Sequence, residues 1–144
     1  MFRCKPTLQL FRHKSTGDFT ILNLALNPNY GAPTGWGPLV HIGADRMRRE
    51  GAELISANLD RFHERSRARS ELETMSLEET SEFYDHRDVL ILWLEDDSEL
   101  VVTPMRRVGP ASHEGKAERT LRLPIPADVF FEQILSAFRD CNGA

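Results

Sequence analysis

The sequence predicts an α+β fold, an antiparallel sheet of about five strands with helices packed on one face. Two apolar segments near the N-terminus are joined by a glycine-containing turn. Three more strand-like segments follow between residues 89 and 123, and the last segment carries an apolar stripe at helical spacing. With 144 residues, 40% of them apolar, the chain has the size of a single domain over residues 1–144.

The chain begins with a predicted hairpin. Residues 7–12 and 19–24 are apolar strand-like segments, and residues 14–18 form a polar turn with a glycine between them. Residues 27–38 are rich in proline and glycine and are expected to form a loop. An antiparallel pair followed by a surface loop is therefore the predicted start of the fold.

Helices are predicted for the middle of the chain. Residues 39–65 are expected to be helical, with Gly51 splitting or kinking the helix. Residues 65–70 read as a basic, polar linker. Ser76 and Glu79 have the spacing of a capping box, which predicts a short acidic helix from residue 77 to about residue 86.

The C-terminal half is predicted to supply the rest of the sheet. Residues 89–94 are continuously apolar, which is typical of a strand buried on both faces. Residues 95–99 are expected to form a turn, and residues 100–104 a returning strand that Pro104 ends. Residues 109–115 read as another loop.

A last strand and a helix are predicted to close the fold. Leu121 and Leu123 alternate with polar residues, which indicates a strand over residues 120–123. The closing helix has an acidic residue, Asp128, at the N-terminus and a basic residue, Arg139, near the C-terminus, as the helix dipole favours. Its apolar stripe consists of Phe130, Phe131, Ile134, Leu135 and Phe138.

The charge distribution is strongly uneven. Residues 71–99 hold eleven of the 22 acidic residues and one basic residue, Arg87. Residues 1–70 hold eleven basic residues and six acidic ones, so the net charge of −4 conceals a local acidic block. Such a block repels nucleic acid and attracts a basic partner or a cation, or it is simply a solvated face.

No catalytic, cofactor or metal site is predicted. The five histidines have no metal-ligand spacing, and no nucleophile motif is present. The loop at residues 31–37 lacks the Lys-Ser/Thr ending of a phosphate loop, and its prolines remove backbone donors. Cys4 and Cys141 are expected to be free thiols, although a bridge between them stays open.

The chain is expected to be cytoplasmic. No apolar run reaches the length needed to span a bilayer, and the N-terminus has no continuous apolar stretch of signal-peptide length. Neither a membrane nor a nucleic acid is a predicted partner.

The acidic block favours a protein-docking surface, because self-repulsion among clustered carboxylates costs stability that a purely structural surface has little reason to accept. It covers a predicted helix and a predicted turn at opposite ends of one strand, and forms either one broad face or two patches. Aromatic side chains are the usual anchors in such an interface. The candidate partner-binding residues are Glu78, Glu79, Glu82, Asp85, Asp88, Glu95, Asp96, Asp97, Glu99, Trp36 and Tyr84.

Three stretches carry a resemblance to a known family. They are residues 8–12 through 17–19, residues 51–54 through 58–63, and residues 121–126 through 130–131 and 137–138. In these core and turn signatures, somewhat under half of the chain, the protein resembles the immunity proteins of bacterial polymorphic-toxin systems, particularly contact-dependent growth inhibition.

The resemblance implies a non-enzymatic function. The chain would bind the C-terminal toxin domain of a cognate effector, often a nuclease, and block its active site or substrate path through an acidic surface that imitates nucleic acid. Two alternatives stay open. One is an adaptor or chaperone for another basic partner, and the other is a small enzyme with a site near residues 27–41, where Trp36 and His41 lie close in sequence.

Overall fold

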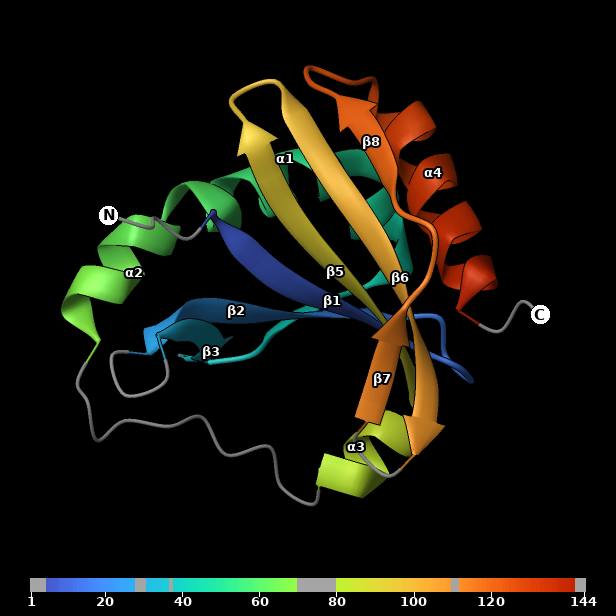
Figure 1. The fold of residues 1–144 in the computed structure, drawn as a ribbon. Helices are drawn as coiled ribbons and strands as arrows, with labels where there is room; N and C mark the ends of the chain where they lie inside the picture. Colours follow the sequence, from blue (N-terminus) through green and yellow to red (C-terminus); the bar gives the residue numbers. More distant parts are fainter. Residues whose placement is uncertain (1–4, 28–30, 37, 70–79, 110–111, 142–144) are drawn as a thin grey trace.

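The computed structural model describes residues 5–27, 31–36, 38–69, 80–109 and 112–141. An eight-stranded antiparallel sheet and four helices make up the described fold (Figure 1). In chain order the elements are β1 (Thr7–His13), β2 (Phe19–Asn27), β3 (Ala32–Gly35), β4 (Val40–Ile42), α1 (Ala44–Asp60), α2 (Phe62–Ala68), α3 (Thr80–Asp85), β5 (Arg87–Asp96), β6 (Glu99–Gly109), β7 (Ser112–Gly115), β8 (Arg119–Arg122) and α4 (Ala127–Asp140). The predicted α+β class is confirmed, with more strands than expected.

The sheet is built on two long hairpins that meet at its centre. The strand order is β3-β2-β1-β5-β6-β7, with β4 also pairing with β2 and β8 also pairing with β6. Leu10 is opposite Ile21 of β2 on one side and opposite Leu90 of β5 on the other. Both predicted hairpins therefore form, and β1 and β5 join them.

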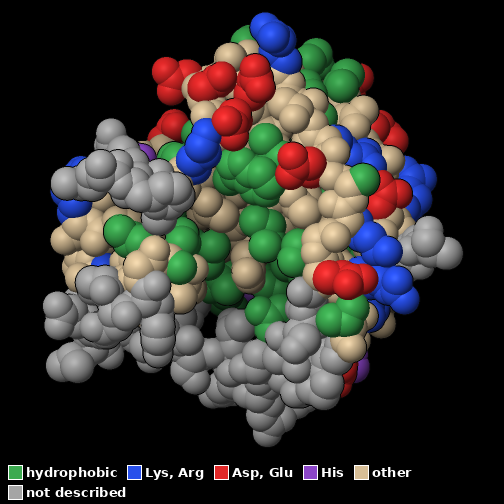
Figure 2. Space-filling view, in the orientation of Figure 1, with side chains coloured by type: hydrophobic (Ala, Val, Ile, Leu, Met, Phe, Trp, Pro, Cys, Tyr) green, Lys and Arg blue, Asp and Glu red, His purple; other side chains and the backbone are tan. Residues whose placement is uncertain are grey.

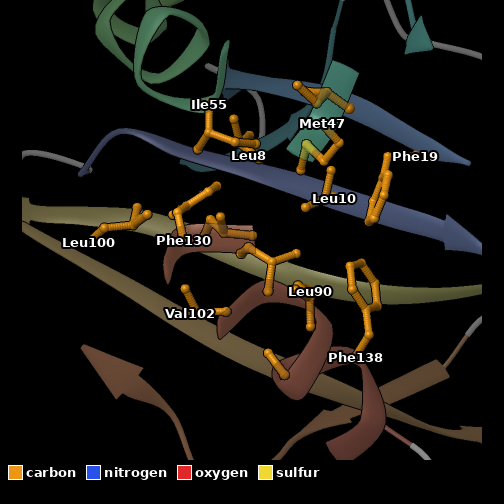
Figure 3. Close-up of a cluster of buried hydrophobic side chains, with 14 of the residues drawn as sticks. Leu8, Leu10, Phe19, Met47, Ile55, Leu90, Leu100, Val102, Phe130 and Phe138 are labelled. Atoms are coloured by element: carbon orange, nitrogen blue, oxygen red, sulfur yellow. The ribbon is translucent and has the colours of Figure 1, made fainter. Parts of the chain in front are cut away.

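The main core lies between the sheet and helices α1 and α4. Even-numbered residues of β1, β5 and β6, such as Leu10, Leu90 and Val102, point toward the two helices (Figure 3). The predicted stripe of α4 faces them: Phe130, Phe131, Ile134 and Phe138 are buried, and Leu135 packs at the margin. The closing helix is therefore part of the core, as predicted.

The predicted helix at residues 39–65 needs correction. Residues 40–42 form β4 on the outer side of β2, and the helical region breaks at Arg61 rather than at Gly51. Gly51 lies inside α1, where an added Cβ would be 3.0 Å from Met47 Sδ and 3.4 Å from Phe130 Cε1. Its lack of a side chain lets α1 approach α4 closely, which explains a glycine there without a kink.

Residues 65–69 of the predicted linker at residues 65–70 are part of the folded domain, and residue 70 lies outside the described residues. Helix α2 continues to Ala68, and the guanidinium of Arg69 is buried beside β2 and β3, where Nη1 donates to Ala25 O at 2.8 Å and to Thr34 O at 3.1 Å. Arg65 Nη2 donates to Asn58 O at 2.7 Å, and burial lowers the pKa of Arg65. The side chains of Arg65 and Arg69 thus donate hydrogen bonds to backbone carbonyls of the fold.

Two predicted loops contain strands, and one strand runs further than predicted. β3 lies in the predicted loop at residues 27–38 and β7 in the predicted loop at residues 109–115. β6 continues through Pro104 to Gly109. Pro104 is the point where the outer neighbour of β6 changes from β8 to β7, so its missing N–H interrupts neither ladder, and its carbonyl accepts from Lys116 N at 2.8 Å.

The opposite face of the sheet is partly open. Phe11 and Val89 form a smaller cluster there with Phe62 of α2, and Phe83 of α3 meets Phe11 edge to face at 4.9 Å. Ile91 and Trp93 lie between this cluster and the β5–β6 turn and are only half-buried. β5 is therefore not buried on both faces, contrary to the prediction from its apolar run.

Candidate protein-binding site

The acidic block is divided into two patches by the length of β5. α3 precedes the first residue of β5, and the turn at residues 95–99 follows its last residues. A strand of ten residues spans about 30 Å at roughly 3.3 Å per residue. Figure 1 shows α3 and the β5–β6 turn at opposite ends of the sheet, so the two ends are two separate surfaces.

The patch at the α3 end is largely compensated where it is described. Asp85 forms an ion pair with Arg107 of β6, and Asp88 Oδ1 lies 3.9 Å from Lys14 Nζ. Glu78, Glu79 and the side chain of Glu82 lie outside the described part of the chain. Asp85 and Asp88 therefore have basic partners, Arg107 and Lys14, that lie outside residues 71–99 of the sequence.

The patch at the turn end is more open. Asp96 Oδ1 accepts hydrogen bonds from Ser98 N at 2.8 Å and Ser98 Oγ at 3.0 Å, which holds the turn and lowers the pKa of Asp96. Glu95 Oε1 lies 2.7 Å from Lys5 Nζ, and this hydrogen bond is the main reason why the pKa of Glu95 is lowered. Figure 2 shows acidic side chains gathered over this end of the hairpin, beside hydrophobic side chains on the sheet.

Helix α1 adds two carboxylates to this end that the sequence prediction missed. Two cavities, of about 460 and 400 Å³, lie between α1 and the β5–β6 turn and share Asp60, Leu94 and Asp97 as lining residues. They form one continuous depression, which we call the α1–hairpin groove. Glu53 of α1 lines its wider part, and Lys5 and His63 line its other end.

Three carboxylates of the groove have no ion-pair partner among the described residues, whereas Glu95 pairs with Lys5. Glu53, Asp60 and Asp97 are exposed, and among the described residues no Lys, Arg or His side chain forms an ion pair with any of the three. Among the same residues no group of three or more His, Cys, Asp or Glu side chains is arranged to hold a metal ion. The electrostatics of the groove thus favour a cationic side chain.

The two predicted aromatic anchors lie away from the groove. Tyr84 packs against Phe11 with ring centroids 5.6 Å apart, and burial raises the pKa of Tyr84. Trp36 follows β3, and its backbone N donates to Asn23 O at 3.0 Å. The structure therefore places Trp36 and Tyr84 apart from the carboxylates of the turn.

Trp93 is the aromatic residue that does lie near the turn. Trp93 lies close to Glu95 and contributes to the lowered pKa of that carboxyl. Residues two apart on a strand share a face, so the Trp93–Glu95 spacing was the signal in the sequence for this contact. The continuous apolar run around Trp93 concealed it.

The pair of residues considered for an enzyme site does not form one unit. Thr20 Oγ1 and His41 Nδ1 lie 3.1 Å apart beside a cavity of about 390 Å³, and His13 and Arg87 also line that cavity. Trp36 is not among its lining residues. Nδ1 of His13 accepts the backbone N–H groups of Ser15 and Thr16 at 3.1 and 3.3 Å, so it serves the turn after β1.

Comparison with known proteins identifies the fold alone. No protein-family model matches the chain. No curated protein matches it either. A solved structure, described as a protein of unknown function from Neisseria meningitidis, superposes with a TM-score of 0.66 over 99% of both chains at 12% sequence identity. Within the described residues, no helix is long and apolar enough to cross a membrane.

Proposed function

We propose that this chain is a non-catalytic binding protein that neutralises a basic toxin domain, the C-terminal domain of a contact-dependent growth inhibition effector. The acidic end of the β5–β6 hairpin is the surface that meets the toxin. The toxin is a nuclease, whose cationic substrate surface is complementary to clustered carboxylates. The complex forms in the cytoplasm, where an incoming nuclease acts.

One observation carries the proposal. Exposed carboxylates from α1 and from the β5–β6 turn, Glu53, Asp60 and Asp97, converge on one groove with no ion-pair partner among the described residues. Uncompensated like charges cost stability, and a cationic partner removes that cost on binding. The class of partner comes from the resemblance in residues 8–19, 51–63 and 121–138.

Co-expression tests the proposal. The toxic C-terminal domain encoded beside this chain's gene is expressed with and without the chain, and cell survival is scored. We expect survival only when the chain is present, and a complex of the two that dissociates as salt is raised. Cell death in the presence of well-folded chain would contradict the proposal. Capture of another basic protein by the same surface would favour the adaptor alternative.

A further inference from the structure

The α1–hairpin groove has an apolar floor beneath its acidic walls. Ala52, Leu94, Leu123 and Ile125 line it and pack on the main core cluster, so the floor is held by the body of the fold. Apolar side chains that stay partly exposed in a concave site gain free energy when a ligand's apolar group covers them. The groove therefore offers a second attraction besides charge.

The carboxylates are arranged along the walls of the groove. Glu53 and Asp60 are seven residues apart in α1, which is two helical turns, so both lie on one face about 10 Å apart. Asp97 of the β5–β6 turn lines both cavities opposite them. A cation lying in the groove is thus flanked by carboxylates from both walls.

The dimensions of the groove fit a short extended segment. The residues of α1 that line the groove run from Ala52 to Asp60, which corresponds to about 12 Å of helix. About four residues of extended chain cover that length.

We infer that the α1–hairpin groove binds an extended, cationic segment of the partner protein in which apolar and basic side chains alternate. The apolar side chains of the segment lie on Leu94 and Ile125, and its basic side chains pair with Glu53, Asp60 and Asp97. This inference rests on the proposed function and assigns a main part of the recognition to α1. Lys5, paired with Glu95, lines the end of the groove away from Glu53.

Three five-residue peptides test the groove directly by fluorescence anisotropy. The first alternates arginine and leucine, the second arginine and serine, and the third glutamate and leucine. We expect the first to bind most tightly, the second about tenfold more weakly because it lacks the floor contacts, and the third not to bind. Equal binding of the first two, or no binding of the first, would overturn the inference.

Charge-reversal variants locate the binding. Glu53→Lys with Asp60→Lys should weaken binding of the arginine–leucine peptide by about tenfold or more. Glu118→Lys with Glu132→Lys is the matched control, since both side chains are exposed, neither lines the groove, and the change in net charge is the same. Glu53→Gln with Asp60→Asn replaces the first variant if the reversal fails to fold. Equal losses in the groove and control variants would overturn the inference.

Toxin co-expression with the same variants separates the two proposals. If the groove variant loses both the peptide and neutralisation, both proposals stand. If it loses the peptide but still protects cells, neutralisation stands and the groove is not where the toxin segment lies. If the native chain binds the peptide but never protects cells, the groove's binding chemistry stands and the toxin proposal fails.

Discussion

Lys5 Nζ lies 2.7 Å from Glu95 Oε1 and 3.1 Å from Glu95 O, and so joins the segment before β1 to the β5–β6 turn across 90 positions of the sequence. The backbone reinforces this link, because Leu94 N donates to Pro6 O at 3.0 Å. Lys5 therefore lines the groove and also lowers the pKa of Glu95, a carboxylate of the same groove.

Replacing Lys5 by methionine should raise the pKa of Glu95 toward its ordinary value, since the Lys5 contact is the main cause of its lowering. Replacing Trp93 by phenylalanine should raise the pKa of Glu95 by less than the Lys5 replacement does. A carboxyl whose pKa is lower in the folded than in the unfolded state stabilises the fold at pH values above its unfolded pKa, about 4.3. This contribution to stability is lost as the pH falls through the pKa of the folded state. Lys5→Met should therefore lose less stability on acidification than the native chain. Carbon-detected NMR titration gives the pKa, and an unchanged value for Glu95 would refute the link.

Charge reversal should distinguish the two acidic ends. Asp97→Lys should slow association with the toxin domain by about threefold to tenfold at low salt, because Asp97 has no ion-pair partner among the described residues. Asp85→Lys is the matched reversal, and Arg107 already offsets that charge. Stopped-flow association at two salt concentrations measures both. A larger effect of Asp85→Lys would move the interface to the α3 end.

Truncation of Phe138 should be among the most damaging changes in α4. Its side chain is 2% exposed and packs against Phe19 with ring centroids 5.9 Å apart. Phe138→Ala should cost about 3–5 kcal/mol of unfolding free energy because it leaves a cavity. Val129→Ala on the same helix is the control, as Val129 is 44% exposed and should change stability by about 0.5 kcal/mol or less. Denaturant unfolding gives both values, and similar costs would remove α4 from the core.

Cys141 should make the fold sensitive to alkaline pH. Burial raises the pKa of its thiol to about 11. Because the pKa of the thiol is higher in the folded than in the unfolded state, its contribution to the stability of the fold is complete below the unfolded pKa, about 8.5. That contribution is lost as the pH rises toward the pKa of the folded state. Between pH 8 and pH 10 the native chain should lose about 1–2 kcal/mol more than Cys141→Ala. Parallel pH profiles of the two proteins would show that the thiol does not titrate this way.

The parts of the fold that the sequence predicted are those with a complete local pattern. The alternation around Leu8 and Leu10 and the stripe from Phe130 to Phe138 identify their elements because burial follows the period of the backbone. Three short strands, β3, β4 and β7, were missed for the opposite reason, whereas the alternation around Leu121 had indicated β8. β3 has four residues and includes Pro33, and an outer strand can accommodate that proline because it needs to pair on one side only.

The candidate site was only partly predictable because tertiary packing assembles it. The acidic turn after β5 was visible as a run of charges, but the neutralising bases Lys14 and Arg107 come from β1's turn and from β6. Glu53 and Asp60 are exposed residues of α1. This side of α1 borders the β5–β6 turn because of the way α1 packs on the sheet. No local sequence pattern encodes that packing.

The two outer margins of the sheet have a consequence for how a partner can attach. Beyond β2 lie β3 and β4, and beyond β6 lie β7 and β8, each only three or four residues long. Among the described residues these margins offer no long backbone template to a strand of another protein, which protects the chain against edge-to-edge aggregation. A partner of the kind proposed would therefore be selected by its side chains, and changes of surface chemistry alone would redirect the specificity.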